Sequence, residues 1–65
     1  MKAKEIRELT LEEIDRALLD CRKEIFNLRL QAQTGQLENP ARIRLLRKEV
    51  ARLETEKTAR RNQAQ

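Results

Sequence analysis

The sequence has no histidine, tryptophan or tyrosine, and only one each of cysteine, glycine, proline and phenylalanine. A lone cysteine cannot form an internal disulfide, so the chain lacks the disulfide bonds that usually stabilise small secreted domains. Without histidine the chain lacks the commonest general base and metal ligand, and a single thiolate cannot make a zinc site. One glycine excludes a glycine-rich phosphate loop. We therefore expect no enzyme, no cofactor, no metal and no small-molecule substrate.

Long hydrophobic runs are also absent. No apolar stretch approaches the roughly 18 residues of a membrane-spanning helix, and the start, Met1-Lys2-Ala3-Lys4-Glu5, leads into no apolar signal segment. A chain of 65 residues forms one domain at most. We expect a single cytoplasmic domain over residues 1–65 with no membrane contact.

The first long helix is predicted over residues 11–34. Thr10 and Glu13 have the spacing of a capping box, in which the hydroxyl accepts from the Glu13 amide and the carboxylate reaches back. Apolar residues then recur at alternating spacings of three and four, which is typical of a coiled-coil seam. The seam consists of Leu11, Ile14, Leu18, Cys21, Ile25, Leu28 and Ala32. Cys21 lies on it, which predicts a small buried hydrophobe rather than a reactive thiol.

Residues 35–39 are predicted to form a loop before a second helix over residues 40–60. Gly35 fits the left-handed position that ends a helix, and Asn39 before Pro40 fits an N-cap followed by proline at the first helical position. The second seam consists of Ile43, Leu46, Val50 and Leu53. The seam is lost at Lys57, and we expect the helix to fray from Arg60 to Gln65.

A loop this short makes the two helices antiparallel neighbours. The seams then match in four layers, which pair Ala32 with Ile43, Leu28 with Leu46, Ile25 with Val50, and Cys21 with Leu53. Residues 2–8 are helix-prone and precede the capping box. The predicted fold is all-α, a long antiparallel two-helix hairpin, coiled-coil-like, with a short extra N-terminal helix.

Three apolar residues of the first helix lie beside its seam: Leu19, Phe26 and Leu30. A two-helix hairpin has no third layer to cover them. One explanation is that the N-terminal segment folds back so that Ile6 and Leu9 cover this stripe. The other is that a protein or RNA partner covers it. The three residues are therefore candidates for a protein contact.

Positive charge is concentrated in the second half of the chain. Residues 1–34 hold seven basic and seven acidic residues, whereas residues 35–65 hold eight basic and four acidic ones. Arginine outnumbers lysine by ten to five, and a planar guanidinium can fork onto phosphate or stack on a base. This asymmetry indicates a polyanionic partner for the second half, although a solvated helix face with ion pairs is an equal reading.

The order of residues adds a resemblance. The run Phe26-Asn27-Leu28-Arg29-Leu30-Gln31, the segment from Thr34 to Pro40, the triplet Arg42-Ile43-Arg44 and the triplet Val50-Ala51-Arg52 closely resemble a bacterial large-subunit ribosomal protein, family number twenty-nine. The opening Glu5-Ile6-Arg7-Glu8-Leu9-Thr10 matches the start of that family, so the resemblance covers essentially the whole chain. It implies a ribosome-bound structural protein that binds large-subunit rRNA beside the exit of the polypeptide tunnel. It also implies a neighbouring ribosomal protein there and an indirect role in docking nascent-chain factors.

The resemblance also implies which residues face RNA. The cations, with those most expected to contact RNA first, and then the uncharged residues in chain order, are Arg44, Lys48, Arg47, Arg42, Arg52, Arg29, Gln31, Thr34, Gly35, Gln36 and Asn39. Capping alone would account for Gly35 and Asn39.

The competing hypothesis is a coiled-coil adaptor or assembly factor that dimerises through its seam and binds protein only.

Overall fold

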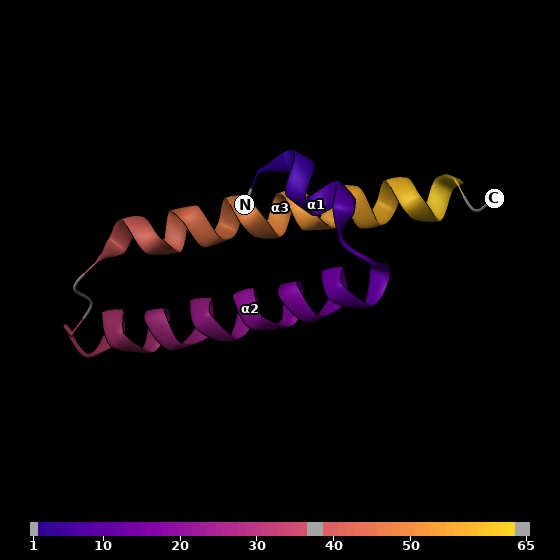
Figure 1. The fold of residues 1–65 in the computed structure, drawn as a ribbon. Coiled ribbons are helices and arrows are strands. Elements are labelled where there is room, and N and C mark those ends of the chain that lie inside the picture. The colour runs from indigo at the N-terminus through magenta and orange to yellow at the C-terminus, as the bar shows by residue number, and fades with distance from the viewer. Residues whose placement is uncertain (1, 37–38, 64–65) are drawn as a thin grey trace.

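The computed structural model describes residues 2–36 and 39–63, and the chain is drawn in Figure 1. Its helices are α1 (Ala3–Glu8), α2 (Leu11–Gln33) and α3 (Pro40–Gln63). Helices α2 and α3 run antiparallel to one another along a rod that measures 46 × 17 × 15 Å (Figure 1). The predicted all-α hairpin with a short N-terminal helix is confirmed.

The start of α2 has the predicted capping box. Thr10 Oγ1 accepts a hydrogen bond from the Glu13 amide at 3.1 Å, and a carboxylate oxygen of Glu13 accepts from the Thr10 amide at 2.9 Å. The hydrogen bonds from the Thr10 backbone and side chain lower the pKa of Glu13. These bonds satisfy two amides that have no partner within the helix.

The end of α2 is closed by Gly35, as predicted. Its φ of 75° lies in the left-handed region that favours glycine. The Gly35 amide donates to the Ala32 carbonyl at 3.2 Å, and the Gln36 amide donates to the Gln31 carbonyl at 2.8 Å. This pair of bonds is a Schellman motif, which caps the last carbonyls of the helix.

The core lies between α2 and α3 and includes one residue of α1. Its buried members are Ile6, Ile14, Leu18, Cys21, Leu46 and Leu53, with Leu9, Ala17, Ile25, Leu28 and Val50 packed against them. Three of the four predicted layers belong to this cluster. The layer of Ala32 and Ile43 does not, since the short Ala32 side chain is exposed and Ile43 is only half-buried. Leu11, at the other end of the seam, is 49% exposed.

Cys21 behaves as a buried hydrophobe that also donates a weak hydrogen bond. Its Sγ atom lies 3.7 Å from a carboxylate oxygen of Glu49. Burial, followed by the negative charge of Glu49, raises the pKa of the Cys21 thiol. Both effects favour the protonated thiol, and the burial of Cys21 agrees with the predicted small buried hydrophobe.

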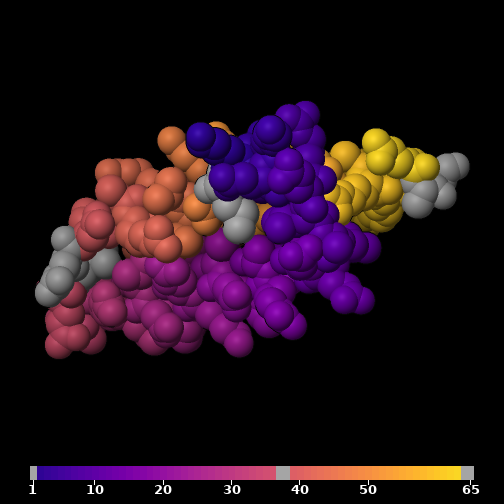
Figure 2. Space-filling view, in the orientation of Figure 1, coloured from indigo at the N-terminus to yellow at the C-terminus, as the bar shows by residue number. Residues whose placement is uncertain are grey.

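Helix α1 packs against α3 and not against the apolar stripe of α2. In the space-filling view its indigo residues lie over the orange and yellow of α3 (Figure 2). Leu19, Phe26 and Leu30 remain 53%, 62% and 46% exposed. The explanation that the N-terminal segment covers this stripe is therefore wrong, because Ile6 is buried in the core between the helices instead.

The expected fraying from Arg60 onward is wrong as far as Gln63, because α3 continues to that residue; residues 64 and 65 lie outside the described residues. The Arg60 guanidinium donates to the carbonyls of Ile6 at 3.3 Å and Arg7 at 3.0 Å, at the end of α1. The Arg60 Nε atom also lies 3.1 Å from a carboxylate oxygen of Glu56. These contacts attach α1 to the last turns of α3, and a local sequence pattern carries no sign of them.

Ion pairs connect α2 and α3 along their flanks. Arg22 pairs with Glu54, and Lys57 lies 2.7 Å from Asp15. The Arg42 guanidinium binds Glu24 with two bonds, of 2.7 and 3.2 Å. Each of these pairs is largely exposed, so we assign them a role in fixing the register more than in stabilising the fold.

Candidate RNA interface

The outer face of α3 presents a group of unneutralised cations. Arg44, Arg47 and Lys48 are exposed, and none of them forms an ion pair with a residue that the structure describes. They lie within two turns of one helix, which holds their charges close together without ordering the flexible side chains. Such a group can contact several phosphates along one backbone.

Arg42 lies in a different environment from this group. Its two hydrogen bonds to Glu24 lower the pKa of that carboxyl group and raise the pKa of the guanidinium. The side chain remains 42% exposed, and three of its five N–H donors are not used by this pair. Arg42 is thus first a link between α2 and α3, and its positive charge is already partly neutralised.

Four of the predicted residues meet at the loop end of the hairpin. A hollow of about 540 Å³ is lined by Leu28, Gln31, Gln36, Asn39 and Arg42. Thr34 lies close in sequence, and its hydroxyl donates to the Gln31 carbonyl at 3.0 Å. The backbone bonds of Thr34 and Gly35 belong to the helix end, so the structure accounts for these two residues as caps.

A second groove, of about 360 Å³, lies on the flank formed by one face of α2 and one of α3. It is lined by Arg22, Ile25, Phe26, Arg29, Arg47 and Val50. The predicted residues Arg29 and Arg47 come together here, although they lie on different helices. Sequence reasoning missed Arg22, which precedes Phe26 by four residues and therefore shares its helix face.

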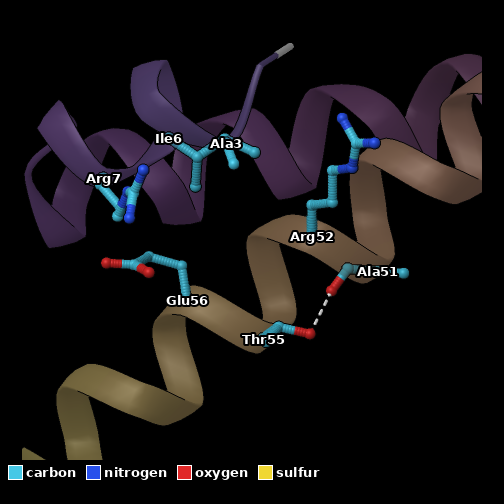
Figure 3. Close-up of a pocket in the computed structure, with 7 residues that line it drawn as sticks. All are labelled: Ala3, Ile6, Arg7, Ala51, Arg52, Thr55 and Glu56. Carbon is cyan, nitrogen blue, oxygen red and sulfur yellow. Dashed lines mark hydrogen bonds between the residues drawn. The ribbon is translucent and has the colours of Figure 1, made fainter.

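A third groove, of about 340 Å³, separates the outer side of α3 from α1 (Figure 3). Its lining residues are Ala3, Ile6 and Arg7 of α1 and Ala51, Arg52, Thr55 and Glu56 of α3. The Thr55 hydroxyl donates to the Ala51 carbonyl at 2.8 Å, which turns it toward its own helix (Figure 3). Arg52 therefore lines a different groove from the loop-end residues. Arg7 of α1 lines the same groove as Arg52, and sequence reasoning missed it.

The predicted residues thus do not form one continuous site. The structure gathers them into the loop-end hollow, the flank groove, the groove beside α1 and the exposed group of Arg44 and Lys48. Among residues 2–36 and 39–63 there is no cluster of three or more metal-ligating side chains. None of the helices in this part of the chain is long and apolar enough to cross a membrane.

Comparison with known proteins assigns the family. The sequence pattern of the family described as Ribosomal L29 protein matches residues 4–60. The chain belongs to the ribosomal L29 protein family. The match begins in α1 and ends in α3, three residues before that helix ends, and it includes all of the residues that the resemblance predicted to face RNA.

Curated relatives of the L29 family are similar over most of the chain. The chain is 60% identical over 55 residues to "Large ribosomal subunit protein uL29" of Geobacillus stearothermophilus, which spans 85% of this chain and 83% of the relative. The protein of the same name from Staphylococcus aureus (strain JH9) is 58% identical, over 85% of this chain and 80% of the relative. The resemblance to this ribosomal family is confirmed, and membership makes the chain a structural ribosomal protein.

Proposed function

We propose that this chain is a ribosome-bound constituent of the large ribosomal subunit that binds folded rRNA mainly through phosphate and sugar contacts. The observation that carries the proposal is the exposed group of Arg44, Arg47 and Lys48, which has no ion pair among the described residues. Folded rRNA crowds phosphates together, and cations without a protein partner are available to neutralise them. Contacts of this kind position a protein and read shape more than sequence.

The loop-end hollow supplies a second kind of contact. Gln31, Gln36 and Asn39 offer amide donors and acceptors that suit ribose hydroxyls and phosphate oxygens. Arg42, which has three N–H donors not used by Glu24, lines the same hollow. We expect this end of the hairpin to contact the sugar-phosphate backbone while the face of Arg44 and Lys48 supplies most of the electrostatic attraction.

The proposed location is the surface around the exit of the polypeptide tunnel, beside another ribosomal protein. Leu19 and Leu30 support a protein neighbour, because the chain leaves both about half exposed on one side of α2. We propose that this face meets the neighbouring ribosomal protein. Docking of nascent-chain factors would then be an indirect consequence of the surface that the two proteins form.

The alternative of a coiled-coil adaptor is less well supported. Dimerisation through the seams requires them to be free, yet Leu18, Leu46 and Leu53 are already buried within one chain. The cross-helix pair of Arg22 with Glu54 also closes one flank of the seam. The two helices of the hairpin therefore bury each other's seam residues without a second chain.

The test is the salt dependence of rebinding to large subunits that have been washed free of this protein. With about four phosphates neutralised, the logarithm of the binding constant should fall with the logarithm of salt concentration at a slope of roughly −3 to −4. Replacing Arg44 and Lys48 together by glutamine should reduce the magnitude of this slope by about two.

Arg42→Gln and Arg44→Gln are a matched pair of variants, because each removes one arginine from α3 but Arg42 is already paired with Glu24. The slope should change by less for Arg42→Gln than for Arg44→Gln. A slope near zero for the wild-type chain, or equal slopes for all variants, would sink the proposed electrostatic role.

A further inference from the structure

The flank groove between α2 and α3 has an apolar floor and an aromatic wall. Ile25 and Val50 are half-buried and pack against the core, so they form a fixed base. Phe26 is 62% exposed, the largest exposed fraction among the large hydrophobic residues of the described chain. Neither the seam nor α1 covers this ring.

The rim of the same groove is basic. Its charged lining residues are Arg22, Arg29 and Arg47, and no acidic residue lines it. Arg22 is paired with Glu54, which lies outside the groove. Arg29 and Arg47 form no ion pair with a described residue, so two guanidinium groups beside the Phe26 ring keep their full charge.

We propose that this groove receives one unpaired RNA base, which stacks on the Phe26 ring while Arg29 and Arg47 contact the phosphates on either side of it. The inference rests on the proposed function and names the feature of the RNA that this flank would recognise. Bases that project from folded RNA are held by stacking on aromatic rings or guanidinium planes. One phenylalanine suits one projecting base and not a run of single strand, which needs successive aromatic residues.

Charge complementarity favours RNA over a protein segment as the occupant. A protein would have to place acidic side chains beside both Arg29 and Arg47, whereas a nucleotide chain carries a phosphate on each side of every base. The volume of about 360 Å³ is in the range of small-ligand sites and open at the surface, which suits a base that enters edge-on from a folded strand. Leu19 and Leu30 do not line this groove and remain available for a protein contact.

The first test is cross-linking by ultraviolet light in intact large subunits that contain the protein. Trypsin cuts after Lys23 and Arg29, and the peptide of residues 24–29 contains Phe26 as its sole aromatic residue. We expect a nucleotide adduct on this peptide, located at Phe26 by mass spectrometry, and its loss in Phe26→Leu. Adducts confined to peptides of α3 would overturn the inference while leaving rRNA binding intact.

The second test is the affinity of variants for washed large subunits. Phe26→Leu keeps an apolar side chain but removes the aromatic face, and it should weaken binding about tenfold. Phe26→Tyr should restore most of the affinity because the ring is kept. The matched control Leu11→Ala removes an exposed apolar side chain of the same helix outside the groove, and it should change affinity by less than about threefold.

The two tests together separate the possible outcomes. Weaker binding of Phe26→Leu without a nucleotide adduct would mean that a protein occupies the groove, and it would refute this inference alone. Unchanged binding of Phe26→Leu would refute it as well. Failure of the wild-type chain to rebind in a salt-dependent manner would refute the proposed function, and this inference with it.

Discussion

At the scale of single residues, Arg42 and Arg44 show how neighbours decide the role of a charge. They lie two positions apart on α3 and therefore point in different directions. Arg42 reaches Glu24 of the other helix at 2.7 Å, whereas Arg44 is exposed and meets no described acid. The same residue type thus links two helices at one position and remains available to phosphate at the other.

Gly35 has a role that depends on its backbone alone. Its φ of 75° closes α2, and a Cβ atom placed there would meet no atom within 4 Å. Gly35→Ala should therefore lower the free energy of unfolding by about 1–2 kcal/mol through left-handed strain and not through a clash. Urea unfolding followed by circular dichroism measures this change.

Gln36→Ala is the control for that substitution. Gln36 contributes its amide to the same helix end, and alanine keeps the amide. Its effect on the free energy of unfolding should stay within about 0.5 kcal/mol. Equal losses in the two variants would show that the left-handed position is not what makes glycine necessary.

At the scale of elements, the start of α2 is stabilised by an ionised carboxylate. The hydrogen bonds from Thr10 lower the pKa of Glu13 below its ordinary value of 4.5. The ionised form of the Glu13 carboxyl group is therefore more stable in the folded state than in the unfolded chain. This contribution is fully present above pH 4.5 and is lost as the pH falls through the lowered pKa.

Glu13→Gln tests this contribution, since glutamine keeps an acceptor for the Thr10 amide and removes the charge. The wild-type chain should be the more stable at neutral pH, and the difference in free energy of unfolding should shrink as the pH falls below 4.5. Thermal unfolding across that range measures it. A difference that stays constant with pH would rule out the charge as the cause.

Helix α3 shows where reasoning by element fails. Its seam ends at Leu53, and the residues that follow suggest a weakening helix. In the structure Arg60 donates to two carbonyls of α1 and pairs with Glu56, so the helix continues. The sequence could not indicate this because the acceptors are backbone atoms more than fifty residues away, and every residue carries such a carbonyl.

At the scale of the whole molecule, α1 completes a core that two helices leave open. Ile14 and Leu18 extend the seam of α2 beyond Leu53, where α3 offers Lys57 and Arg60 in place of apolar residues. Ile6 enters this end of the core and is only 2% exposed. A small domain depends strongly on each such residue, because its total stability is low.

Ile6→Ala should therefore lower the free energy of unfolding by about 2–5 kcal/mol, as expected for a fully buried aliphatic side chain. Much of the cooperative unfolding transition of the isolated protein should be lost, which thermal melting by circular dichroism would show. Leu30→Ala removes a leucine that is 46% exposed, and its cost should be smaller by several fold. Similar costs for the two variants would mean that α1 does not pack as described.

The sequence by itself determined the hairpin. Alternating spacings of three and four, Thr10 with Glu13, Gly35 and Pro40 are local signals, and each acts through neighbours within one or two helical turns. Such signals do not depend on distant parts of the fold, so both ends of α2, the start of α3 and the antiparallel pairing of the two helices could be predicted from them. The motifs around the loop likewise sufficed to indicate the ribosomal family.

Only the tertiary structure decided what each exposed or charged residue meets. It placed α1 on α3, left the stripe of Leu19, Phe26 and Leu30 open, and paired Arg42 with Glu24. It also joined Arg29 and Arg47 in one groove although they lie on different helices. These outcomes depend on distances between segments far apart in the chain, where small differences in packing and charge select one arrangement and no local pattern specifies it.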